Sequence, residues 1–203
     1  MREGLYGEES DNAHIEYCYN HGNITSAKYV GGIAGCGQYG TKANCYNAGA
    51  INGTREYVGG IAGTNGNHFG GTITKSNYNI GIVSTTSGHT GAILGWSGYR
   101  PNISNNYYIE GTADYGVSST YNGGSGSNTG TIAVSAEELK QKSTSLGKEY
   151  WKDDIYHINS GYPILAWQTD NDNLNLINGD NAFVEDTEGI NNGYPLLAWQ
   201  VNN

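Results

Sequence analysis

Proline, phenylalanine and methionine are nearly absent from this chain of 203 residues, which has 3 Pro, 2 Phe and 1 Met. Helix-favouring residues are also scarce before residue 132, where Gly, Asn, Thr, Tyr and Ile predominate. The chain nevertheless contains 32 Gly, 17 Tyr and 36% hydrophobic residues. This composition favours many short strands joined by turns over a helical fold.

Positive charge is also scarce, because 10 scattered Lys and Arg face 19 Asp and Glu and give a net charge of −9. A nucleic-acid groove or an anionic membrane surface needs a concentrated basic patch, so neither partner is expected. No apolar run is long enough for a membrane span, and the opening "MREGLYGEESDN" lacks the apolar centre of a signal peptide. If the natural protein is exported, we expect its signal and anchor to lie outside this chain.

The cysteine count of three excludes a complete disulfide framework, and the absence of a CxxC pair disfavours a zinc site. Cys18 and Cys45 occupy the same place in an internal repeat. Two interpretations remain, a stacked pair of small buried side chains or a disulfide, and the first is favoured.

The chain repeats itself at intervals of about 30 residues, most visibly in "YVGGIAG" at 29–35 and 57–63. The four copies cover residues 15–35, 43–63, 75–95 and 104–120, with equivalent tyrosines at Tyr19, Tyr46, Tyr78 and Tyr107. Such a period is typical of solenoids, in which each unit packs only on its neighbours. The short runs of Tyr, Val, Ile and Thr between Asn and Gly predict strands. The sequence therefore predicts an all-β parallel β-helix of about four coils, each with three strands and three turns.

Three sets of equivalent residues are expected to form columns along the stack. An Asn column would link coils through its side-chain amides, Gly residues would supply positive φ, and Ile residues would bury against one another. The columns are Asn20, Asn47 and Asn79; Gly22, Gly49 and Gly81; and Ile33, Ile61 and Ile93.

The repeat "GGIAG…NCYNAG" resembles the GLUG motif, a Gly-rich repeat of large bacterial cell-surface and adhesin-like proteins. The motif also occurs in non-catalytic regions of bacterial immunoglobulin A metalloproteases. The resemblance covers about residues 12–112, and implies a surface or adhesive role without catalytic residues. The matching positions are Gly31, Gly32, Ile33, Gly35, Cys45, Tyr46, Asn47, Gly49, Gly59, Gly60, Ile61, Gly63, Asn77, Tyr78, Asn79 and Gly81.

The composition changes at residue 132, which divides the chain into repeats at 1–131 and a capping region at 132–203. Ser135 and Glu138 form a capping-box pattern that predicts one short helix. A second internal repeat follows at an offset of 32 residues, with "GYPILAWQ" at 161–168 and "GYPLLAWQ" at 193–200. We expect this region to continue the solenoid or to cover its open end, because unpaired strand edges need protection.

Catalytic signatures are lacking: the sequence has no GxSxG, HExxH or P-loop motif. Many parallel β-helices degrade acidic polysaccharides with clustered carboxylates, but the acids between residues 12 and 112 are only Glu16, Glu56 and Glu110. We therefore expect a non-enzyme without a cofactor. Asp170 and Asp172 open an oxygen-rich stretch that is read as a polar turn, with a Ca²⁺ loop as the alternative.

The leading hypothesis is a structural or adhesive module of a bacterial surface or secreted protein, acting as a rigid spacer or a binding face. The module is expected to be extracellular and monomeric within a longer protein, with a surface glycan or protein as its partner. The alternatives are a carbohydrate-binding module and a polysaccharide-degrading β-helix enzyme. Sugar stacking would use the aromatic residues Tyr29, Tyr57, Trp96 and Tyr99.

Overall fold

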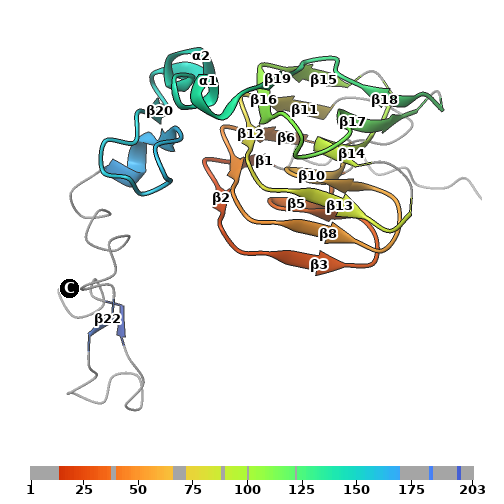
Figure 1. Ribbon diagram of the computed structural model, residues 1–203, viewed down its shortest axis with the longest axis horizontal. Coiled ribbons are helices and arrows are strands. Elements are labelled where there is room, and N and C mark those ends of the chain that lie inside the picture. The colour runs from red at the N-terminus through yellow and green to blue at the C-terminus, as the bar shows by residue number, and fades with distance from the viewer. Residues whose placement is uncertain are drawn as a thin grey trace, which may run out of the picture.

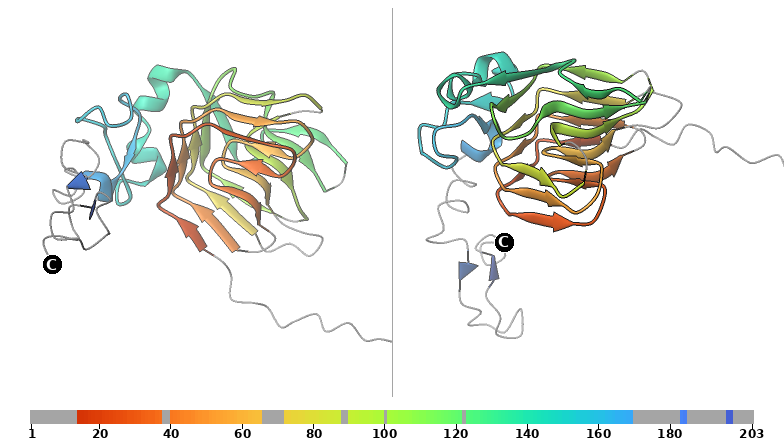
Figure 2. Two further views of the ribbon diagram at one scale, coloured as in Figure 1. Left: turned by 90° about the horizontal axis from the view of Figure 1, so that it is seen from below. Right: turned by 45° about the vertical axis from the view of Figure 1, so that its right-hand side comes forward.

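The structure is a computed structural model that describes residues 14–37, 40–65, 72–87, 90–99, 101–121 and 123–169, together with the strands Phe183–Val184 and Leu196–Leu197. Within these residues the chain winds into a β-solenoid whose successive coils pair through parallel strands (Figure 1). Figure 2 shows the coils stacked in chain order from two further sides. The predicted all-β parallel β-helix of about four coils is confirmed.

Four sheets form the walls of the solenoid. The first consists of β1 (His14–Glu16), β6 (Gly40–Ala43), β11 (Thr72–Lys75) and β15 (Asn102–Ser104). The second consists of β2 (Tyr19–Asn20), β7 (Tyr46–Asn47), β12 (Tyr78–Asn79), β16 (Asn106–Ile109) and β19 (Thr131–Val134). The third consists of β3 (Ile24–Ser26), β8 (Ile51–Gly53) and β13 (Val83–Thr85). The fourth contains β4 (Val30–Gly31), β5 (Ala34–Gly37), β9 (Val58–Gly59), β10 (Ala62–Asn65), β14 (Gly91–Ser97) and β17 (Tyr115–Thr120), with the antiparallel β18 (Ser125–Ser127) at its end.

The coil has four walls rather than the three strands and three turns that the sequence predicted. The missed corner lies between the first and second sheets, where each coil bends at one non-glycine residue with positive φ. Since no glycine marks these positions, this turn could not be predicted from the residue types. The four residues are Tyr17, Asn44, Ser76 and Asn105.

The Asn and Ile residues of equivalent repeat position lie in register. Asn20 Nδ2 donates to Asn47 Oδ1, and Asn47 Nδ2 donates to Asn79 Oδ1, each at 2.7 Å. The backbone of Ile33 bonds to that of Ile61, which bonds to that of Ile93. Ile61 and Ile93 belong to one buried cluster, and the partly buried Ile33 packs against it. Each coil is therefore tied to the next by side-chain amides as well as by strand pairing.

The glycines that follow these asparagines serve close approach and not positive φ, contrary to the prediction. None of Gly22, Gly49 and Gly81 has a positive φ. A Cβ atom on Gly49 would lie 2.0 Å from the carbonyl oxygen of Gly22, and one on Gly81 would lie 1.9 Å from that of Gly49. Any side chain at Gly49 or Gly81 would push two coils apart, whereas Gly22 of the first coil has only Asn20 Oδ1 within reach, at 3.5 Å.

The tyrosines of the second sheet form a ring stack on its outer side. The ring centroids of Tyr19 and Tyr46 lie 5.2 Å apart, and those of Tyr46 and Tyr78 lie 5.1 Å apart with nearly parallel planes. Tyr46 and Tyr78 are fully buried. The region after residue 134 covers them.

This covering region contains α1 (Ala136–Lys140), α2 (Ser143–Gly147), β20 (Trp151–Lys152), β21 (Ile164–Leu165) and the 3-10 helix η1 (Ala166–Thr169). The Ser135–Glu138 capping box at the start of α1 is confirmed. A second helix, α2, was not predicted. Its segment "STSLG" has weak helix formers and no side-chain cap, but Leu146 is buried in the cluster that contains Tyr46 and Tyr78.

The covering region lies along the side of the solenoid and not across an open end, which corrects the expected placement (Figures 1 and 2). Trp151 Nε1 donates to Asn44 Oδ1, and the hydroxyl of Tyr78 donates to the carbonyl of Pro163. Gln168 Nε2 donates to the hydroxyl of Tyr46 at 3.1 Å. The covering region therefore buries the rings of Tyr46 and Tyr78 on the second sheet.

Two strands at the second "GYPxLAWQ" unit pair antiparallel in the same register as those at the first. Phe183 and Leu197 pair in β22 (Phe183–Val184) and β23 (Leu196–Leu197), as Trp151 and Leu165 pair in β20 and β21. The rest of this unit lies outside the described residues.

Candidate functional site

The aromatic residues Tyr29, Tyr57 and Trp96 come together in a column on one corner of the solenoid. Tyr29 lies between β3 and β4, and Tyr57 lies between β8 and β9, so the strand register places one ring above the other. Their centroids are 5.2 Å apart with planes 19° from parallel, and Tyr57 meets Trp96 edge-on at 6.2 Å. Tyr29 is 43% exposed. We call these three residues the aromatic column.

The backbone at the column is conformationally unusual. Tyr29 has φ of 56° and Tyr57 has φ of 68°, in the left-handed region that bulky residues rarely occupy. Such conformations persist only where the surrounding structure enforces them, and they concentrate at functional positions. The ring stack therefore comes at a backbone cost in two successive coils.

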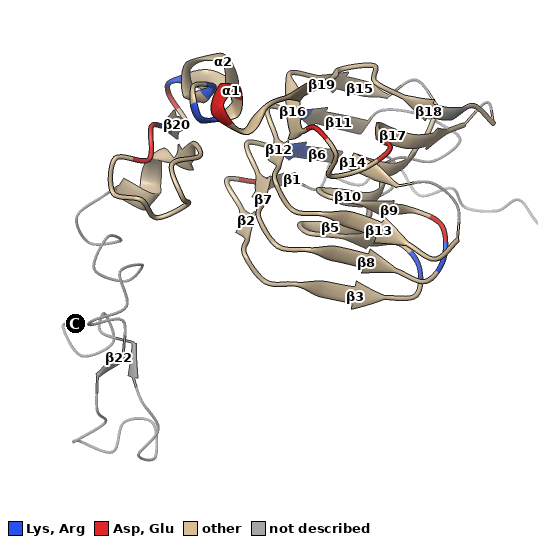
Figure 3. Cartoon of the chain, in the orientation of Figure 1, with Lys and Arg blue, Asp and Glu red and all other residues tan. Residues whose placement is uncertain are grey.

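Lys28 and Glu56 flank the column and give it a polar edge. Lys28 Nζ lies 4.9 Å from the ring centroid of Tyr29 and 5.0 Å from that of Tyr57, in cation–π geometry. The same ammonium contacts Glu56 Oε1 at 2.8 Å. The hydrogen bond to Lys28 lowers the pKa of Glu56, and that to Glu56 raises the pKa of Lys28. Figure 3 shows how few charged residues otherwise lie on the walls of the solenoid.

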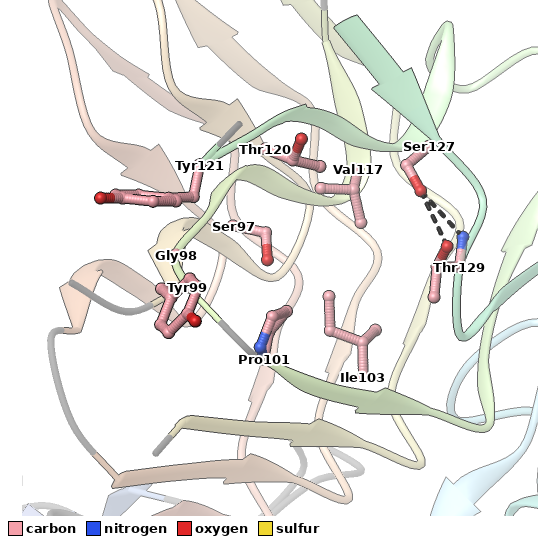
Figure 4. A pocket seen from close by; sticks show the side chains of 10 residues that line it. All are labelled: Ser97, Gly98, Tyr99, Pro101, Ile103, Val117, Thr120, Tyr121, Ser127 and Thr129. Atoms are coloured by element: carbon pink, nitrogen blue, oxygen red, sulfur yellow. Dashed lines mark hydrogen bonds between the residues drawn. The ribbon is translucent and has the colours of Figure 1, made fainter. Parts of the chain in front are cut away.

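Tyr99, the fourth predicted aromatic, does not join the column. It lines a separate pocket with a volume of about 260 Å³ at the end of the solenoid, where its ring centroid lies 5.4 Å from that of Tyr121 (Figure 4). Tyr121 follows β17 and was missed by the sequence reasoning. No repeat position links it to Tyr99, so only the coil geometry brings the two rings together.

Lys42 is a second feature that the sequence did not indicate. Its side chain is 2% exposed, and its Nζ donates to the carbonyl of Gly37 at 3.3 Å. Lys42 pairs with Ile15 and Thr74 in the first sheet. Burial lowers the pKa of the ammonium.

The corner beside the tyrosine stack contains a second polar column. Its equivalent position is Cys45 in the second coil, Asn77 in the third and Asn106 in the fourth. Cys45 N donates to Asn77 Oδ1, and Asn77 Nδ2 donates to Asn106 Oδ1 at 2.9 Å. Cys45 is buried, and burial raises the pKa of its thiol to about 12. Cys18 is exposed, which corrects the interpretation of two buried side chains. It precedes β2, the edge strand of the second sheet, and no further described strand pairs there to cover it. All three cysteines are free thiols.

No cluster of three or more His, Cys, Asp or Glu that could hold a metal ion occurs among the described residues. Asp170 and Asp172, the possible Ca²⁺ ligands, lie outside the described residues. In the described part of the chain, no helix has the length and apolar character needed to cross a membrane.

Comparison with known proteins does not assign this chain to a family. No protein-family model matches the chain, and no curated protein matches it. A solved structure with similarity is the crystal structure of a protein from Bacteroides ovatus described as a candidate immunoglobulin A1 protease. It shares 25% sequence identity and a TM-score of 0.49, and the match covers 74% of this chain but 56% of that one.

Proposed function

We propose that this chain is a non-catalytic structural module of a bacterial surface or secreted protein, in which a stiff β-solenoid spaces or presents a binding face. The observation that carries the proposal is the coil-to-coil continuity of the stack. Parallel strands, the Asn20–Asn47–Asn79 ladder and the Tyr19–Tyr46–Tyr78 rings all link the same neighbouring coils. The resemblance of the repeats to GLUG motifs supports an extracellular location.

Stiffness follows from how these links are distributed. Each coil is held on several walls at once, so bending the stack would break strand pairs on one side and compress glycine contacts on the other. Gly81 already leaves no room for a Cβ atom between coils. The module is accordingly expected to transmit force along its axis without extending.

A single-molecule pulling experiment tests the spacer role. The chain would be placed between two reference domains of known unfolding force and stretched along the solenoid axis. We expect no extension before one cooperative rupture of the stack. Gradual lengthening at low force would contradict a stiff spacer.

A second candidate function, carbohydrate binding, is favoured by the aromatic column. Stacked rings with one exposed face suit the apolar face of a sugar, although Lys28 already occupies part of this space. A glycan array separates the two roles, because a pure spacer should bind nothing. Loss of glycan binding in Tyr29→Ala would assign that binding to the aromatic column.

Incubation with pectin, alginate and hyaluronan, read by absorbance of unsaturated products, tests the expectation of no lyase activity.

A further inference from the structure

The pocket that contains Tyr99 has an apolar wall formed by different coils. It lies between the end of β14, β15 and the β17–β18 hairpin, so four separate segments enclose it (Figure 4). Pro101, Ile103 and Val117 supply aliphatic surface. Val117 is 1% exposed, which places it at the inner end of the pocket.

Ser97 is an unsatisfied polar group in this apolar setting. Its side chain is 1% exposed, and its Oγ has no hydrogen-bond partner in the described structure. Figure 4 shows the hydroxyl pointing toward the space that the lining side chains enclose. Buried hydroxyls are normally paired, so this one is available to bond with a group that enters the pocket.

The opposite side of the pocket is open and aromatic. The rings of Tyr99 and Tyr121 meet at 63°, and Tyr121 is 40% exposed. Ser127 and Thr129 add hydroxyl groups that bond to each other at 3.0 Å on the rim. The mouth therefore offers flat apolar faces next to groups that can donate and accept hydrogen bonds.

The size and charge of the pocket restrict what could fill it. Its volume of about 260 Å³ is below the range of roughly 300–1,000 Å³ for sites that hold drug-sized ligands. None of the described residues that line it is charged. A ligand of one ring without formal charge fits, and its surface should combine apolar C–H groups with hydroxyls.

We propose that this pocket binds one neutral sugar residue, a pyranose at the end of a glycan chain. The apolar face of the ring lies against Tyr99 and Tyr121 and its edge against Pro101 and Ile103, while one sugar hydroxyl bonds to Ser97 Oγ. This site is separate from the aromatic column. It goes beyond the structural role and does not require the column to bind anything.

The test is an NMR titration of the full chain with individual methyl pyranosides of glucose, galactose, mannose and fucose. Methyl glucuronoside serves as the charged comparison, and p-cresol as an aromatic ligand of similar size. We expect at least one neutral pyranoside to bind, with Ser97→Ala weakening it about 2- to 12-fold, the usual effect of one lost hydrogen bond. Tyr121→Ala should also weaken binding, whereas the matched variant Tyr29→Ala should not.

Protein stability distinguishes loss of the site from loss of the fold. Ser97→Ala removes an unpaired hydroxyl, so its melting temperature should equal or exceed that of the parent. Binding of no neutral pyranoside, tighter binding of p-cresol, or unchanged affinity in Ser97→Ala would overturn the proposal. A loss confined to Tyr29→Ala would also overturn it and assign sugar binding to the column, while the pulling experiment would still judge the spacer role independently.

Discussion

At the residue scale, Lys42 places a cation where a solenoid normally keeps apolar or amide side chains. Burial lowers its pKa, so the folded chain holds the proton less tightly than the unfolded chain does. This destabilisation is present at neutral pH and disappears as the pH rises above the unfolded Lys value of about 10.4. The residue is therefore a weak point of the first sheet.

Lys42→Met should raise the free energy of unfolding at pH 7 by about 1 kcal/mol, because an apolar side chain of similar length replaces a buried ammonium. The gain should be smaller at pH 10, where the parent lysine loses its charge. Urea denaturation at both pH values measures this. Lys75→Met, at an exposed position of β11, is the control and should change little. An equal gain at both pH values would speak against a charge effect.

Two glycines at equivalent repeat positions, Gly81 and Gly22, allow a matched pair of substitutions to alanine. In Gly81→Ala, the new Cβ would lie 1.9 Å from the Gly49 carbonyl oxygen, so we expect a loss of about 1–3 kcal/mol from overpacking. In Gly22→Ala, the nearest atom is Asn20 Oδ1 at 3.5 Å, and the stability should stay within about 0.5 kcal/mol of the parent. Thermal unfolding of both variants compares the two positions. Similar losses would mean that helix and strand propensity, not coil spacing, governs these glycines.

At the element scale, Trp151 is the largest buried side chain by which the region from α1 to η1 packs on the second sheet. This side chain is 1% exposed and lies 5.3 Å from the ring of Tyr78. Leu139 and Leu146 from the two helices join the same cluster. A short helix such as α2 depends on this packing, because it has neither strong propensity nor a cap.

Trp151→Ala should destabilise this region by about 3–5 kcal/mol through the cavity and the lost hydrogen bond to Asn44. Hydrogen exchange should then accelerate in α1, α2 and β21, and in the tyrosine strands β7 and β12 beneath them. The control is Ile155→Ala, a change in the same region at a side chain that is 71% exposed. Faster exchange in the helices alone would show that the tyrosine stack does not need its cover.

At the scale of the whole molecule, the second and third coils are related by one constant offset. The pairs Thr41–Ile73, Tyr46–Tyr78, Ile51–Val83 and Ala62–Leu94 in the four walls are all 32 residues apart. Deleting residues 46–77 therefore removes one whole coil and leaves the register of the others intact. Each coil packs only on its neighbours, so the shorter stack has the same kind of contacts.

We expect this deletion variant to retain its β-rich circular dichroism and a cooperative transition at a lower melting temperature. The covering region follows the last coil and should keep its contacts with Tyr78, while Tyr19 takes the place of Tyr46 at the spacing of one strand, roughly 4.8 Å. Deletion of residues 46–61, which removes half a coil, should abolish cooperative folding because it misaligns every wall. Equal behaviour of the two variants would contradict a register-locked solenoid.

Repeat position was the reliable signal in the sequence, since residues that recur at one offset must occupy equivalent places in a stack. That reasoning placed the Asn, Ile and Tyr columns, and the capping box placed α1. It gave the wrong role for Gly22, Gly49 and Gly81, because glycine suits close approach as well as positive φ. It also missed the corner at Asn44, where a non-glycine residue adopts the left-handed conformation.

The sequence alone determined that this chain stacks in parallel coils, because its period and its short β-favouring runs leave few other ways to bury Tyr and Ile. Only the tertiary structure decided what the tail covers, since Trp151 and Gln168 could be matched to Tyr46 and Tyr78 only once the rings were seen to stack outward. The pocket beside Ser97 is likewise a feature that only the tertiary structure decided. Its walls come from four segments with no shared repeat position, and contacts of that kind exist only after the coils have closed.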